Sequence, residues 1–199
     1  DEMQRFGTTA NETAKQLGVA TSDFTEGALI YFQQGLDEET STKLAEVTAK
    51  AANVTGQSMK ATSEELTAVW NGYNVAAENA EQSVDKLAAV AASSASDLQE
   101  LATSMSKVAS AANAMGVGED QLAAQLSTII SVTRQAPESV GTALKTIYAR
   151  MSDIKMGSDE AEITLGNYTA KMAQMGVNVL DANGQLREMG DVIEEIGSK

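Results

Sequence analysis

The sequence predicts an all-α protein built from antiparallel helical hairpins in a bundle, with one small β-hairpin near the C-terminus. Three observations lead to this fold class. Apolar residues recur at spacings of three and four along most of the chain, which is the pattern of amphipathic helices. Glycines recur at helix-like intervals, often shortly before a Ser or Asp that can begin the next helix. An Asn-Gly pair flanked by alternating valines is the single departure, near the end of the chain.

The composition favours a thin helical core and excludes several kinds of site. Hydrophobic residues make up 43% of the chain, but aromatic residues only 4%. Much of the apolar content is alanine, which favours helix but buries little surface. The absence of cysteine and histidine excludes disulfides, thiolate nucleophiles and histidine triads, and argues against zinc sites. We therefore expect modest stability, and neither a metal nor any other cofactor.

The charge argues against two classes of partner. The formal net charge is −14, which opposes a surface that neutralises phosphates and a polybasic membrane patch. We expect no direct nucleic-acid binding, and no membrane contact from this segment. The chain begins at Asp1 rather than at methionine, and we expect it to be a piece of a longer protein.

Glycine and capping residues place the helix boundaries. Gly35 followed by Asp37, and Gly56 followed by Ser63, illustrate the sequence of a stop, a tight turn and a new start. The predicted helices span residues 8–17, 22–34, 37–55, 63–72, 76–93, 96–115, 119–134, 137–154, 158–175 and 190–197.

Three of these segments carry a narrow apolar stripe. Each stripe lasts only two or three heptads before a glycine or proline interrupts it, whereas a long coiled coil needs more. Short stripes joined by short turns favour antiparallel hairpins stacked side by side. The stripes are Leu44, Val47, Ala51 and Val54; Leu98, Leu101, Met105, Val108, Ala112 and Met115; and Val140, Leu144, Ile147, Met151 and Ile154.

The stretch GVNVLDANGQLREM predicts the β-hairpin. Val177 and Val179 alternate before Asn183-Gly184, a pair that tolerates the positive φ angles of a two-residue turn, and Leu186 follows. We expect a two-stranded hairpin at about 177–187, followed by a short terminal helix. Residues 1–176 are then a helical bundle segment on which 177–199 packs, and the two together form one domain.

Motifs of catalytic type are present but lack their context. Ser104 and Lys107 match S-x-x-K, yet the partner motifs of the serine acylases are missing. GVGEDQ lacks the third glycine of a dinucleotide loop and follows a predicted helix. DANG lacks the glycine and glutamate that a calcium loop needs further on. We therefore expect no enzymatic activity.

The stretch TRQAPESVGTALKTIYARM concentrates unusual features. It holds the chain's single proline, Pro137, at a position suited to the first turn of a helix. Gly141 lies inside that helix, where glycine costs about 1 kcal/mol relative to alanine, so we expect another helix to pack closely there. Arg134, Lys145 and Arg150 make the segment basic. Two interpretations remain open: these cations pair with acidic neighbours in the same chain, or they contact a partner.

This stretch resembles the core region of phage tail tape measure proteins, in which a Gly-Thr-Ala-Leu-Lys-Thr-Ile-aromatic-x-Arg run follows a Pro-Glu turn. Three other stretches resemble the same family in the same order. They begin at AKAANVTGQSMK, SASDLQELATSM and GVNVLDANGQL, and the resemblance covers roughly residues 8–197. The interaction residues that the motif implies are Arg134, Pro137, Gly141, Thr142, Leu144, Lys145, Tyr148 and Arg150.

The resemblance implies a structural protein of a phage or prophage tail. Such a protein fills the tail tube during assembly and helps to set its length. The implied partners are the tail tube protein, the tail assembly chaperones and sister tape measure chains. The implied locations are the virion tail lumen and, during assembly, the bacterial host cytoplasm. Family members are usually several times longer than this chain. The alternative is a helical protein–protein interaction module of a signalling or secretion system.

Overall fold

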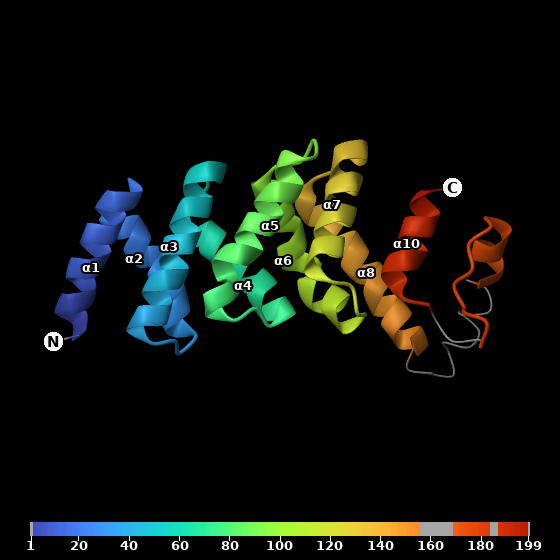
Figure 1. Cartoon of the computed structure of the whole chain (residues 1–199), viewed down its shortest axis with the longest axis horizontal. Coiled ribbons are helices and arrows are strands. Elements are labelled where there is room, and N and C mark those ends of the chain that lie inside the picture. Colours follow the sequence, from blue (N-terminus) through green and yellow to red (C-terminus); the bar gives the residue numbers. More distant parts are fainter. Residues whose placement is uncertain (1, 156–168, 184–186, 199) are drawn as a thin grey trace.

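Over residues 2–155 the helices stack side by side in a row that follows the sequence, and the terminal helix lies between this row and residues 169–183 (Figure 1). The computed structural model describes residues 2–155, 169–183 and 187–198. Within these ranges the prediction of an all-α protein is confirmed. The elements are α1 (Glu2–Leu17), α2 (Thr21–Gln33), α3 (Glu38–Thr55), α4 (Met59–Tyr73), the 3₁₀ turn η1 (Ala77–Asn79), α5 (Ala80–Ala92), α6 (Leu98–Ala114), α7 (Glu119–Thr133), α8 (Pro137–Lys155) and α10 (Met189–Gly197).

The row has two layers. In the even layer α2 packs on α4, α4 on α6 and α6 on α8, whereas in the odd layer α1 packs on α3, α3 on α5 and α5 on α7. Contacts between consecutive helices, such as α2 with α3 and α6 with α7, join the layers. Each hairpin therefore contributes one helix to each layer, and the array grows by adding hairpins, as in helical repeat proteins.

Caps and glycines end the helices much as the sequence predicts. The Asp37 side chain accepts a hydrogen bond of 2.8 Å from the Thr40 amide and begins α3. Gly56 ends the same helix with φ +72°, a conformation that costs glycine little. Asp97 and Glu100 form a reciprocal capping box at the start of α6.

Some predicted boundaries are wrong. The helix expected at 63–72 begins four residues earlier, because Ser58 is its cap and accepts from the Ala61 amide at 3.2 Å. The helix expected at 8–17 begins at Glu2; its first turns gain an apolar contact, since Phe6 meets Phe32 edge to face with ring centroids 5.0 Å apart. The segment 76–93 divides into η1 and α5. Of the helix expected at 158–175, only 169–175 is described, and 169–174 is helical.

The apolar stripes form the core with two exceptions. The whole α6 stripe from Leu98 to Met115 is buried. Val54 is 76% exposed and Ile147 is 41% exposed, against prediction. In α8 both Ile147 and Tyr148 fit a helical period, and the larger Tyr148 takes the buried place. The Ile154 side chain lies outside the described part.

Close backbone approaches hold the even layer together. A Cβ atom on Gly72 of α4 would lie 2.7 Å from the Ala109 Cβ and 2.8 Å from the Ser110 amide nitrogen of α6. A Cβ atom on Gly141 of α8 would lie 3.0 Å from the carbonyl carbon of Ser104, and closer still to its oxygen. The expectation of a close helix neighbour at Gly141 is therefore confirmed.

The predicted β-hairpin is wrong: the described residues of 177–187 contain no strand. Val177 and Val179 are both buried, so the alternation does not separate a core face from a solvent face. One backbone hydrogen bond of 3.0 Å runs from the Arg187 amide to the Val179 carbonyl. Burial of both valines in the core overrode the local turn signal, because an isolated two-stranded hairpin is marginal. Residues 184–186, including the predicted turn glycine, lie outside the described part.

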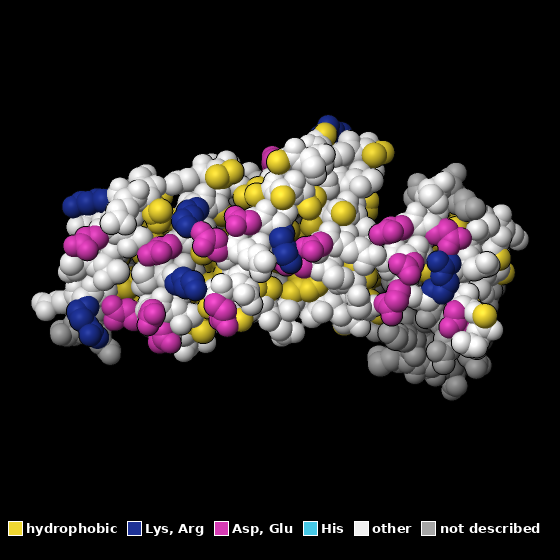
Figure 2. All heavy atoms as spheres, in the orientation of Figure 1, with side chains coloured by type: hydrophobic (Ala, Val, Ile, Leu, Met, Phe, Trp, Pro, Cys, Tyr) yellow, Lys and Arg dark blue, Asp and Glu magenta, His cyan; other side chains and the backbone are white. Residues whose placement is uncertain are grey.

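The terminal helix α10 packs on α7. The Gln121 side-chain amide donates to Glu194 at 3.2 Å, and Val192 is buried. Acidic and basic side chains are intermixed over the face of the molecule drawn in Figure 2. In the part of the chain that is described, no helix combines the length and apolar character needed to cross a membrane.

Candidate functional site

The turn before α8 fixes the first residue of the basic stretch. Arg134 follows the last turn of α7 in a left-handed conformation with φ +54°. Its guanidinium Nη1 donates 2.9 Å to the Ala95 carbonyl, which lies between α5 and α6. Arg134 therefore ties the α7–α8 turn to a neighbouring loop, and Pro137 begins α8 three residues later.

Three of the predicted interaction residues form the buried side of α8. Gly141 lies against the α6 backbone, and Leu144 and Tyr148 are buried. The Tyr148 hydroxyl donates 2.7 Å to the Gln125 side-chain oxygen of α7. Burial raises the pKa of the Tyr148 phenol above its ordinary value. These residues position α8 between α6 and α7, and they are inaccessible to a partner.

The remaining members of the set face solvent. Thr142, Lys145 and Arg150 are exposed. No ion pair among the described residues includes Lys145, Arg150 or Arg134. Whether these cations pair with acidic neighbours of the same chain or contact a partner stays open, because acidic residues that follow them in the sequence lie outside the described part. The structure divides the predicted set into an anchoring side and an exposed basic side.

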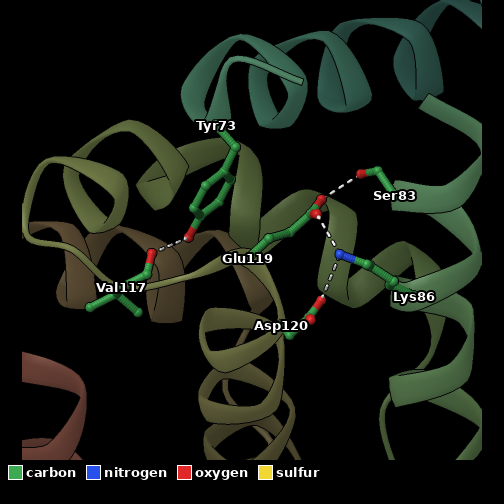
Figure 3. Close-up of polar contacts among 6 residues, drawn as sticks. All are labelled: Tyr73, Ser83, Lys86, Val117, Glu119 and Asp120. Atoms are coloured by element: carbon green, nitrogen blue, oxygen red, sulfur yellow. Dashed lines mark hydrogen bonds and ion pairs between the residues drawn. The ribbon is translucent and has the colours of Figure 1, made fainter. Parts of the chain in front are cut away.

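A polar cluster that sequence reasoning missed joins α4, α5 and α7 (Figure 3). The Ser83 hydroxyl donates to one carboxylate oxygen of Glu119. The Lys86 ammonium lies 3.9 Å from the other oxygen of Glu119 and 3.4 Å from Asp120. The Tyr73 hydroxyl donates 3.2 Å to the Val117 carbonyl. The acidic residues also suit the first turn of α7, where the helix dipole favours negative charge.

This cluster has a structural role in the GVGEDQ segment. Gly116 has φ +83°, Gly118 precedes the first turn of α7, and Tyr73 and Lys86 hold the segment from two sides. The prediction of a helix–helix turn is confirmed. No local signal could have identified the cluster, because its hydrogen-bonded partners lie 36 and 44 positions apart in the sequence.

The S-x-x-K motif is part of the α6–α8 contact. Ser104 is fully buried, and its hydroxyl donates 3.0 Å to the Leu101 carbonyl of its own helix. Its carbonyl is the group closest to Gly141. Among the residues that the structure describes, no three acidic side chains gather where they could hold a metal ion.

Comparison with known proteins identifies a matching protein family but no matching solved structure. The family model described as phage-related minor tail protein matches residues 7–199. No solved structure matches the chain. Because the match covers nearly the whole sequence, the chain belongs to the family of phage-related minor tail proteins, and its role is a structural one in a phage tail.

Proposed function

We propose that this chain is a tape measure segment that lies in the tail lumen of a phage or prophage and helps to set tail length during assembly. Four stretches resemble tape measure proteins in order, and the family match agrees with a tail component. In this proposal the chain acts without catalysis. Its partners are the tail tube protein, the assembly chaperones and sister copies, and it is present in the host cytoplasm while the tail is built.

The observation that carries the proposal is the serial stacking of the hairpins (Figure 1). A ruler requires a length that scales with the number of residues. A closed bundle lacks this property, because added residues fold back, whereas an array of hairpins lengthens with each hairpin. Packed helices lie about 8–10 Å apart, so a stacked hairpin adds about 10 Å. The same residues as one continuous helix add about 1.5 Å each.

The charge fits a protein of the tail lumen. Its net charge of −14 disfavours attachment to DNA, which uses the same lumen after the protein has moved. The thin alanine core, with Ala45, Ala49 and Ala112 fully buried, stabilises each interface modestly. Such an array can open into extended helices where tube walls or sister chains cover the apolar stripes.

An in-frame deletion of Ala80–Met115 in the gene that encodes the chain tests the proposal. It removes 36 residues, which comprise α5 and α6, one helix from each layer. Electron microscopy then measures tail length. Shortening by about 54 Å indicates extended helix, and shortening by about 10 Å indicates a stacked array.

Tails of unchanged length would contradict the length-setting role. A tandem duplication of the same 36 residues is the reciprocal experiment, and it should lengthen the tail by the amount that the deletion removes. The duplication also serves where the deletion yields no tails, since it keeps every native helix in the chain.

A further inference from the structure

The N-terminal end of the array carries an apolar groove between α1 and α2, bounded by the start of α3. Its cavity volume is about 970 Å³, and its apolar lining includes Phe6, Leu29, Phe32 and Leu36. Leu29 of the even-layer helix α2 is 50% exposed, so this apolar side chain is only partly covered. In helical repeat arrays each unit buries its apolar surface against a neighbour. The groove has the form of an unfilled helix position in the even layer.

The rim of the groove is acidic. The charged residues that line it are Glu26, Asp37 and Glu38. Lys60 approaches Glu26, and Arg5 approaches Glu38, only to 3.8 Å. Of these four side chains only Glu38 is partly buried, and ion pairs near the surface are weak. A helix that fits this groove therefore combines apolar or small side chains with a cation.

The last described helix of the even layer, α8, carries such a face. On α8, Ala143, Thr146, Ile147 and Arg150 follow the spacing i, i+3, i+4, i+7 of a helix that docks in a groove. All four are exposed, and this face points away from Gly141, which contacts α6. A shallow cavity of about 450 Å³ runs along the same helix beside Ala143 and Thr146. Ile147 supplies an apolar anchor, and Arg150 supplies the charge.

We propose that α8 of one copy docks into the α1–α2 groove of a second copy, so that the even layer continues from chain to chain. Two observations specify this occupant. The acidic rim complements Arg150, and the new contact repeats the one by which each even helix packs on the next within the chain. The contact joins two different surfaces, so it propagates into open-ended assemblies rather than closing as a dimer.

The inference deepens the sister-chain contact of the proposed function and rests on it for its biological setting. It can nevertheless fail independently, because self-association is measured in solution, whereas length control is measured on tails. If the chain self-associates but does not set tail length, the interface stands and the length-setting role fails. If the chain sets tail length but does not self-associate, the length-setting role stands and the interface fails.

Sedimentation velocity over a concentration series of the 199-residue chain tests the interface. The wild-type chain should form species larger than dimers as the concentration rises. Leu29→Asp and Ile147→Asp should each weaken the association at least about tenfold, since each buries a charge in an apolar contact. Val132→Asp is the matched control, because Val132 is 78% exposed on α7 and lies outside both surfaces; it should leave the association unchanged.

A charge exchange gives the sharpest result. Glu26→Arg and Arg150→Glu should each abolish assembly alone, because like charges then face one another. A mixture of the two variants should assemble, since each reversed surface finds its complement on the other chain. A wild-type chain that stays monomeric at millimolar concentration, assembly insensitive to Leu29→Asp or Ile147→Asp, or a mixture that stays monomeric would each overturn the proposal.

Discussion

Replacing Gly141 by alanine should destabilise the array, although alanine is the better helix former. The favourable effect of propensity is at most about 1 kcal/mol. The unfavourable effect follows from the α6–α8 contact. The new Cβ would lie 3.0 Å from the Ser104 carbonyl carbon, closer to its oxygen, and 3.1 Å from the Lys107 Cβ, whereas ordinary contacts begin at 3.4 Å. Because the nearest groups belong to backbone, the two helices must separate.

The cost of separation can be set by the contacts that it weakens. A gap of about 0.5–1 Å forfeits about a quarter to a half of the attraction between facing atoms. Both helices carry buried side chains, such as Met105 of α6 and Leu144 of α8, and α6 packs on α8. Overpacking of this kind typically costs about 1–3 kcal/mol. We therefore expect a net loss of about 1–2 kcal/mol for Gly141→Ala, and a larger loss for Gly141→Leu.

Urea denaturation followed by circular dichroism measures this effect, and Gly7→Ala is the matched control. Gly7 is also inside a helix, but a Cβ there would meet nothing within 4 Å, so its variant should be unchanged or up to about 1 kcal/mol more stable. A Gly141→Ala midpoint equal to or above that of the wild type would refute the close approach as the reason for this glycine.

Two further predictions concern buried polar groups. Glu65 of α4 accepts a hydrogen bond of 2.8 Å from the Thr103 hydroxyl, while its other carboxylate oxygen is buried without a hydrogen-bond partner. Burial raises the pKa of Glu65 above the ordinary 4.5. Folding stability should therefore fall as pH rises from about 4.5 through the raised pKa. Glu65→Gln should therefore unfold at higher urea than the wild type at about pH 7 and at similar urea at about pH 3, with the exposed Glu64→Gln as control; equal midpoints at neutral pH would argue against this account. Tyr148→Phe removes the 2.7 Å hydrogen bond to Gln125 and leaves a buried amide oxygen unpaired, which should lower the free energy of unfolding by about 1–3 kcal/mol. Tyr73→Phe loses a 3.2 Å hydrogen bond at a partly exposed position and should cost less in the same denaturation assay. The opposite order of the two costs would disprove the reasoning.

The sequence predicted features that depend on local spacing. The α6 stripe from Leu98 to Met115 was correct because strong apolar residues recur at one period and no alternative face competes. Gly141 was informative because glycine inside a good helix requires a reason. The α8 stripe was partly wrong, since Ile147 and Tyr148 are neighbours that both fit the period, and only the packing of α6 and α7 decides between them.

Features that depend on distant contacts were not predictable. The valines at 177 and 179 alternate like a strand, yet both are buried and belong to the hydrophobic core. The pairing of Ser83 and Lys86 with Glu119 depends on α5 lying beside α7, and no pattern near either segment indicates it. The two-layer order arises because each helix packs on the helix two places further along the chain. The apolar periodicity of a single helix does not determine which face makes that contact.

The layered order also governs how the molecule comes apart. In a closed bundle every helix contacts a shared centre, so loss of one helix removes support from all. Among the described helices, α1 and α2 pack mainly on each other and on α3 and α4. The first hairpin can therefore detach while the middle of the array stays folded. Unfolding then proceeds from the ends inward as a series of nearest-neighbour steps. Amide protection should be highest in α6, which has neighbours on both sides, and should decline toward α1.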